Sequence, residues 1–204
     1  MKEKMDMLNG SIWNKLPRYA LPVAATGILG QLFNASDLAI VGNFTGSDST
    51  VAVAAVGANS PVIGLILNFF IGIALGANIV IAHAVGRGDE KTIRKAVNTS
   101  VLMALAGGIA IAVAGEFCIE ALLRLLNIPE DVFPYALLYI KIYLLGMPAI
   151  LLYNFEAAIF RSIGDTKTPL LVLAVSGLLN VALNLFFVIM LDMTVEGVAI
   201  ATAV

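Results

Sequence analysis

Polar side chains recur at regular intervals inside stretches of the sequence that are otherwise apolar. The interval is three in one run and four in another: Gln31, Asn34 and Asp37, then Ser176, Asn180 and Asn184. In a helix, both intervals place the side chains on one face. A carboxylate surrounded by amide and hydroxyl oxygens can take up a proton or bind a sodium ion. These residues are therefore candidates for cation binding.

The composition indicates that this chemistry takes place in a membrane. Hydrophobic residues make up 60% of the 204 residues and charged residues 13%, whereas soluble domains are about half apolar and about a quarter charged. The net charge is −2, and there is no basic tract, which argues against nucleic-acid binding. The first apolar run is not expected to be a signal peptide. It extends from about Leu16 to Val41, longer than the roughly 7–15 residues of a signal peptide core, and it contains Asp37. Cys118 and His83 are each the only residue of their type, so we expect packing roles rather than a disulfide or a metal site.

Six apolar segments are separated by short polar stretches. A helix needs about 20 residues to cross the hydrocarbon, and the runs are continuous rather than alternating, which excludes barrel strands. The sequence predicts an all-α, polytopic membrane helix bundle with six transmembrane helices, at 17–41, 51–83, 93–117, 132–160, 169–191 and 195–204. The second and fourth segments exceed the required length, so we expect them to tilt, kink or extend into water.

The sixth segment is shorter than a membrane is thick. Residues 195–204 would form about 15 Å of helix, against about 30 Å of hydrocarbon. We therefore expect a truncated sixth helix in a fragment of a longer protein. The expected division is a cytoplasmic N-terminal segment, 1–15, and a transmembrane lobe, 16–204.

Basic residues predict the orientation. Ten of the 12 lysines and arginines fall on one predicted side of the membrane. Of the other two, Arg124 falls on the opposite side and Lys141 lies within the fourth segment. The ten precede the first segment or flank the second and fourth connections: Lys2, Lys4, Lys15, Arg18, Arg87, Lys91, Arg94, Lys95, Arg161 and Lys167. Because cytoplasmic loops carry the excess of Lys and Arg, the N-terminus is predicted to be cytoplasmic.

The second and fourth connections resemble each other. One reads GDEKT at 88–92 and the other GDTKT at 164–168. In each, the glycine can end one helix and the aspartate can cap the next. The similarity fits either two ordinary helix-hairpin turns or an internal repeat.

Depth along the helices predicts which polar residues meet. At 1.5 Å per residue, Asn180 and Asn184 lie about 17 and 23 Å from Thr168, and Thr202 lies about 10 Å from the outer end of its helix. Asp37 is near the outer end of the first helix, so these residues are predicted to meet in the outer half. A charge at this depth costs about 2.5–3.5 kcal/mol, which favours a functional role for Asp37. For each of the others, an interhelical hydrogen bond worth about 0.6 kcal/mol is an equally good explanation.

The fourth segment carries two more polar residues, Asn154 and Glu156. Glu156 lies about 8 Å along the helix from Arg161, so it can be a cavity residue or an ion-pair partner at the interface. Within the first segment, Pro22 removes a backbone donor, and we expect a bend near it.

A set of motifs in fixed order resembles the multidrug and toxic compound extrusion (MATE) family. The first segment contains LP at 21–22, QLFNASD at 31–37 and VG at 41–42. There follow AAVG at 54–57, SP at 60–61, AHAVGRGD at 82–89, FRSIGDTKTP at 160–169, NVALN at 180–184 and EGVAIAT at 196–202. The set covers nearly the whole chain.

This resemblance implies twelve helices in two lobes, with the C-terminal lobe absent from this chain. It implies a cell-membrane transporter rather than an enzyme, without a cofactor, that exports organic, often cationic, compounds in exchange for H⁺ or Na⁺. In the DinF-like branch, the aspartate matching Asp37 is implicated in coupling, and bending near Pro22 is the family's proposed switch. The fifth-helix pattern there is Asn-x-x-x-Asp. Asn180 matches it, whereas Asn184 replaces the second carboxylate with an amide that does not titrate.

The leading hypothesis is an antiporter lobe with a coupling-ion site and a drug cavity. The ion site comprises Asp37, Asn180, Asn184 and Thr202, and the cavity is lined by Gln31, Asn34, Asn154 and Glu156. One alternative is a lipid-linked oligosaccharide flippase, although such cavities tend to be rich in Arg and Lys, and here only Lys141 lies well inside a segment. Another is a structural subunit without transport, in which the two polar stripes would pack directly together.

Overall fold

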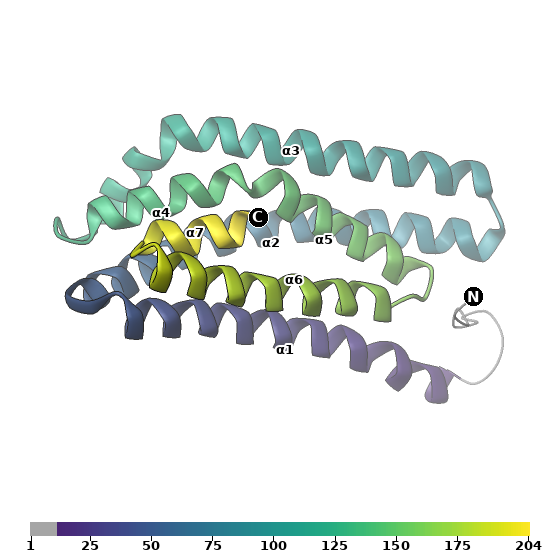
Figure 1. Ribbon diagram of the computed structural model, residues 1–204. Coiled ribbons are helices and arrows are strands. Elements are labelled where there is room, and N and C mark those ends of the chain that lie inside the picture. The colour runs from purple at the N-terminus through teal and green to yellow at the C-terminus, as the bar shows by residue number, and fades with distance from the viewer. Residues whose placement is uncertain (1–11) are drawn as a thin grey trace.

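The computed structural model describes residues 12–204, and within that range all regular structure is helical. Most of the expected segment 1–15 therefore lies outside the described residues. The elements are α1 (Ile12–Phe44), η1 (Gly46–Asp48), α2 (Ser49–Arg87), α3 (Glu90–Leu125), α4 (Phe133–Leu145), α5 (Met147–Ser162), α6 (Lys167–Leu185), η2 (Phe186–Met190) and α7 (Val195–Ala203). Figure 1 shows them as one elongated bundle.

The predicted order of apolar segments is confirmed. In the described part of the chain, four stretches are long and apolar enough to cross a membrane: Lys15–Phe44, Ser49–Arg87, Glu90–Leu125 and Lys167–Met190. Helices α4 and α5 meet the same criteria when they are taken together, with a bend of 53° between them. Helix α7, with 9 residues, is shorter than the roughly 20 residues that a span needs.

The bend between α4 and α5 lies at Gly146. Pro148, in the first turn of α5, has no N–H to donate to the preceding turn. The carbonyl of Gly146 instead accepts hydrogen bonds from the amides of Ala149 and Ile150, both at 3.1 Å. Helix α3 approaches this break so closely that a Cβ at Gly108 would overlap the backbone of Pro148. The fourth segment is thus kinked, one of the outcomes expected from its length.

The two similar connections adopt one geometry, and the predicted caps are confirmed. Gly88 and Gly164 have φ of +68° and +83°, the left-handed region that glycine adopts at helix C-termini. Asp89 accepts a hydrogen bond from the amide of Thr92 at 3.0 Å, and Asp165 from that of Thr168 at 3.0 Å. We call the end of the bundle that holds these two turns and the start of α1 the basic end.

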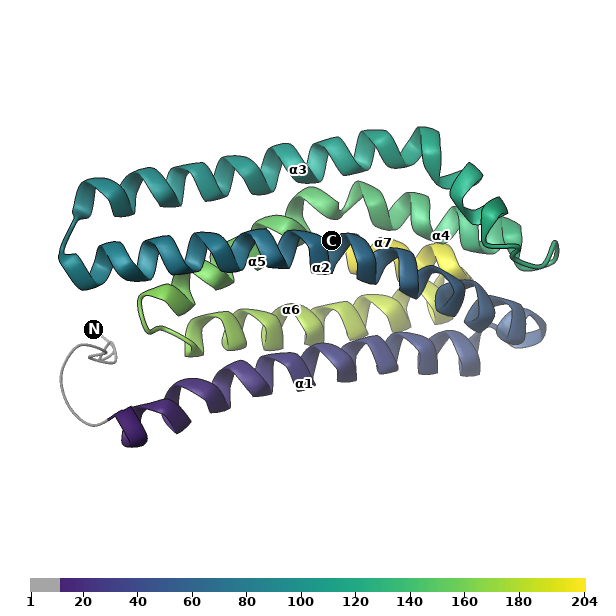
Figure 2. The ribbon, with the colours of Figure 1, turned by 180° about the vertical axis from the view of Figure 1, so that it is seen from behind.

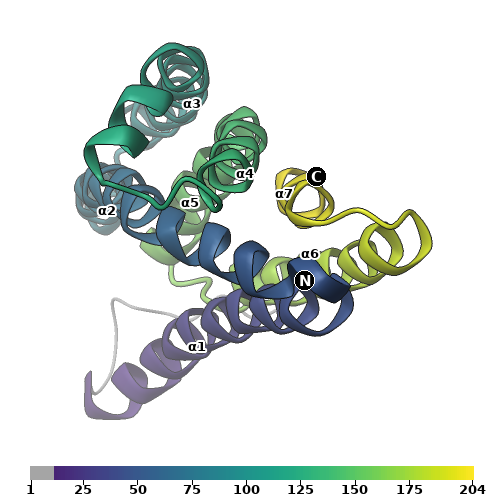
Figure 3. The same cartoon turned by 90° about the vertical axis from the view of Figure 1, so that its left-hand side faces the viewer.

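Helices α1 and α6 lie side by side along the bundle (Figure 2), while α7 lies against α4 and α6 (Figure 3). Despite Pro17 and Pro22, α1 is one continuous helix. A Cβ at Gly177 on α6 would overlap the ring of Phe33 on α1. Because the two backbones approach this closely, polar residues one or two turns further along α1 and α6 come into contact.

Candidate functional site

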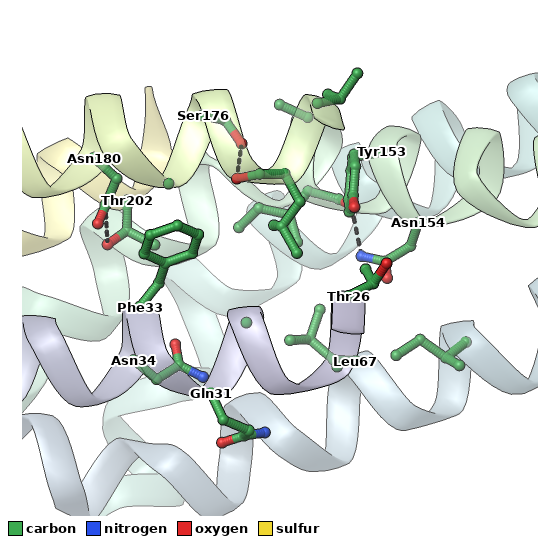
Figure 4. Close-up of a pocket in the computed structure, with 18 of the residues that line it drawn as sticks. Thr26, Gln31, Phe33, Asn34, Leu67, Tyr153, Asn154, Ser176, Asn180 and Thr202 are labelled. Carbon is green, nitrogen blue, oxygen red and sulfur yellow. Dashed lines mark hydrogen bonds between the residues drawn. The ribbon is translucent and has the colours of Figure 1, made fainter. Parts of the chain in front are cut away.

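A cavity of about 700 Å³ lies between α1, α2, α4, α5, α6 and α7. Its walls combine aliphatic side chains with a set of polar ones, namely Thr26, Gln31, Asn34, Asp37, Tyr143, Tyr153, Asn154, Arg161, Ser176, Asn180 and Thr202. Figure 4 shows Asn180 and Thr202 joined by a hydrogen bond, with Phe33 beside them.

The four predicted ion-site residues are in contact through a chain of hydrogen bonds. Asn184 donates from Nδ2 to Asp37 Oδ1 at 2.6 Å and lies 3.2 Å from Asn180 Oδ1. Asn180 Nδ2 donates to Thr202 Oγ1 at 3.3 Å, and that hydroxyl donates to the carbonyl of Val198 at 2.9 Å. Residues from α1, α6 and α7 therefore meet at one level, as the depth estimate predicted.

One oxygen at this site has no partner. Asp37 is 6% exposed and Asn184 is fully buried, yet Asn184 Oδ1 accepts no hydrogen bond from the described residues. A buried acceptor left unsatisfied costs about 1–3 kcal/mol. A cation between this oxygen and the Asp37 carboxylate would satisfy both groups. The site offers one carboxylate with neutral oxygens, and no cluster of three His, Cys, Asp or Glu residues forms within 12–204.

Two tyrosines that sequence analysis missed lie close to the ion site. Tyr139 and Tyr143 on α4 are buried, and their rings stack with centroids 6.1 Å apart. Both are near enough to Asp37 to interact with its charge, and Tyr143 lines the cavity. Their spacing of four predicts a shared helix face, but it does not distinguish a site from an ordinary core.

The predicted cavity residues are only partly brought together. Gln31, Asn34 and Asn154 line the cavity, whereas Glu156 does not and is exposed. Two residues along a helix correspond to a rotation of about 200°, so Glu156 faces away from the surface that Asn154 presents. No ion pair links Glu156 to Arg161 among the described residues. Pro22 lies one residue before the first lining position, Val23.

The structure also bears on the two alternatives. The stripes on α1 and α6 touch at Asp37 and Asn184, but Gln31, Asn34 and Ser176 open onto the cavity, unlike the direct packing expected of a structural subunit. Lys141 lies outside the cavity and pairs with Glu116 at 3.3 Å. Arg161 is the one basic side chain among the described lining residues. A flippase would be expected to have a lining rich in Arg and Lys.

Comparison with known proteins gives a consistent result. The MatE family pattern matches residues 22–186. The chain is 29% identical over 197 residues to the probable multidrug resistance protein YpnP of Bacillus subtilis, covering 97% of this chain and 44% of YpnP. It is 32% identical over 173 residues to the probable multidrug resistance protein YoeA of the same organism, covering 85% of this chain and 37% of YoeA.

A solved structure described as MATE in the bent conformation superposes on the whole chain with a TM-score of 0.90 and 25% identity, and the match covers 44% of that structure. The chain thus spans less than half of the length of the relatives that it matches.

Proposed function

The chain belongs to the MatE family, and from this premise we propose that it forms the N-terminal lobe of a secondary multidrug antiporter. MATE proteins are transporters rather than enzymes and need no cofactor. The proposed transporter exports organic compounds, often cations, in exchange for H⁺ or Na⁺. A second, C-terminal lobe would complete the pathway, in keeping with the greater length of the relatives.

The observation that carries this proposal is the contact between Asp37 and Asn184. Asp37 is a buried carboxylate that accepts a hydrogen bond from one amide and has no ion-pair partner among the described residues, so a proton or a cation can neutralise it. The unpartnered Oδ1 of Asn184 supplies a further ligand. Asn180 and Thr202 complete a shell of neutral oxygens.

Coupling follows from the position of Asp37. It belongs both to the ion site and to the cavity lining, so a cationic cargo bound there competes with the coupling ion for the same charge. Each would displace the other. This mutual exclusion is the minimal requirement for exchange of one for the other across a membrane.

We further propose that the basic end faces the cytoplasm and that the protein lies in the cell membrane. The basic residues at this end include Arg87, Lys91, Arg94 and Lys95 beside one turn and Lys167 beside the other, which is the distribution typical of cytoplasmic loops. In this orientation Asp37 lies in the outer half of the bilayer.

The test uses the full-length transporter reconstituted in vesicles, with Asp37→Asn compared with the wild type. We expect at least about a tenfold loss of ion-driven efflux, since more than 1.4 kcal/mol of coupling free energy would be removed. Imposing a proton gradient and a sodium gradient separately identifies the ion. Glu116→Gln, which neutralises a carboxylate outside the cavity, is the control. Unchanged efflux in Asp37→Asn would refute the assignment.

A further inference from the structure

The cavity carries opposite charges at its two ends. Among the described lining residues, Asp37 and Arg161 are the only charged side chains. The hydroxyl of Tyr19 donates to the backbone carbonyl of Arg161 at 3.3 Å, which places Arg161 beside the start of α1. Tyr19 precedes Asp37 by 18 residues in one continuous helix, a separation of about 27 Å at 1.5 Å per residue. A cargo entering from the basic end meets Arg161 well before Asp37.

Arg161 differs from most of the basic residues around it. The basic side chains that are exposed at this end are Arg18, Arg87, Lys91, Arg94, Lys95 and Lys167. Arg161 is half-buried and lines the cavity. No carboxylate forms an ion pair with it among residues 12–204. A basic residue that served only to mark the cytoplasmic side would not need to face a cavity.

The surroundings of Arg161 suit the binding of an anionic group. Tyr153 on the same helix lines the same cavity as Arg161. Its hydroxyl donates to the carbonyl of Pro169 at 3.2 Å, which fixes the ring against α6. A guanidinium presents N–H groups in a rigid fork that matches the two oxygens of a carboxylate or phosphate. An aromatic side chain in the wall of the same cavity can hold the apolar body of the same molecule.

We propose that Arg161 is an anion subsite at the basic end of the cavity, and that the cargo includes amphiphilic compounds bearing a carboxylate or phosphate. The inference rests on the proposed antiporter function and specifies the chemistry of its cargo. A simple organic monocation would be repelled at Arg161 and attracted at Asp37. A molecule with both a cationic and an anionic group has a favourable partner at each stage of entry.

The experiment measures equilibrium binding to the purified full-length transporter by fluorescence anisotropy. The probes are a carboxylated rhodamine and its methyl ester, which share the cationic ring system and differ only in the anionic group. We expect Arg161→Gln to weaken binding of the carboxylated dye by about tenfold or more, the loss typical of a charge-assisted hydrogen-bonded pair. The ester should change by less than about twofold or bind more tightly, because a repulsive charge is removed.

Arg161→Lys keeps the charge but loses the fork, so it should bind the carboxylated dye with intermediate affinity. Arg18→Gln, an exposed basic residue at the same end, is the matched control and should leave both dyes unchanged. The proposal would be overturned if Arg161→Gln and Arg161→Lys weakened the binding of the two dyes equally. It would also be overturned if neither dye changed in affinity.

A lipid headgroup could supply the same oxyanion, and the lipid composition separates the two sources. Binding is repeated in nanodiscs of phosphatidylcholine alone and in nanodiscs that also contain phosphatidylglycerol. A carboxylate-specific effect of Arg161→Gln in phosphatidylcholine alone supports a cargo subsite. An effect that appears only with phosphatidylglycerol would assign Arg161 to the lipid and overturn the proposal. Because binding does not require an ion gradient, this result stands apart from the Asp37→Asn efflux test.

Discussion

Two carboxylates in the apolar bundle, Asp37 and Glu116, are held in different ways. Glu116 on α3 pairs with Lys141 on α4 at 3.3 Å, and the two side chains are 37% and 35% exposed. Asp37 on α1 is 6% exposed and receives a hydrogen bond from the amide of Asn184 at 2.6 Å. No lysine or arginine forms an ion pair with Asp37 among the described residues.

The difference shows how an intramembrane carboxylate becomes available for exchange. For Glu116, the ammonium of Lys141 on the neighbouring helix supplies the counter-charge. The amide of Asn184 donates a hydrogen bond to Asp37 but supplies no positive charge, which leaves neutralisation of this carboxylate to a proton or a mobile cation. The lack of a fixed counter-charge, rather than the presence of a carboxylate, is what distinguishes the candidate ion site.

The largest effect on efflux is expected when Asp37 is given a fixed counter-charge like that of Glu116. In Asn184→Lys, an ammonium would stand where the amide now donates to Asp37, reproducing the Glu116–Lys141 arrangement. We expect ion-driven efflux to fall by about a hundredfold, since a tethered charge competes with the free ion at very high effective concentration. Efflux assays in vesicles measure the loss. Asn184→Gln, which keeps the amide, should retain more activity than Asn184→Lys, and equal activity in the two would contradict the comparison.

The second test concerns the close packing of α1 on α6 that brings Asp37 to Asn184. In Gly177→Leu, the new side chain would overlap the ring of Phe33, so we expect a loss of about 1–3 kcal/mol in stability and weaker coupling. Thermal unfolding in detergent reports the first effect. Gly72→Leu is the control because nothing lies within 4 Å of a Cβ at Gly72. Equal melting temperatures for the two variants would show that this packing is not required.

The smallest effect is expected at the Glu116–Lys141 pair. Both side chains are more than a third exposed, so Lys141→Met should cost only about 0.2–1 kcal/mol of stability and leave efflux within about twofold. The double variant Glu116→Gln with Lys141→Met should recover the stability, because no unpaired charge remains. Thermal unfolding and efflux are measured on the same preparations. A large loss of efflux in Lys141→Met would place this pair in the transport mechanism and remove the contrast with Asp37.

The sequence predicts those features that depend on local spacing. Long apolar runs predicted the spans, and the Gly-Asp pairs at 88–89 and 164–165 predicted both turns. The meeting of Asp37, Asn180, Asn184 and Thr202 followed from a constant rise per residue along straight helices. The same reasoning fails where a helix breaks, and so the sharp bend at Gly146 was foreseen only as one of several outcomes for an overlong segment.

Features that depend on rotation about a helix axis or on a partner helix were harder to predict. Glu156 was grouped with Asn154 by proximity in sequence, although two residues along a helix face different directions. The pairing of Lys141 with Glu116 joins helices that are neighbours only in space. Arg161 had been counted as a marker of orientation, and only the structure shows that it lines the cavity.

The most direct measurement of exchange at Asp37 is whether cargo binding releases the coupling ion. Cargo is added to the purified full-length transporter in weakly buffered solution, and released H⁺ and Na⁺ are recorded with a pH indicator and a sodium-selective electrode. We expect stoichiometric release of one of the two ions from the wild type and from Glu116→Gln, and none from Asp37→Asn. Equal release from the wild type and Asp37→Asn would show that Asp37 does not hold the coupling ion.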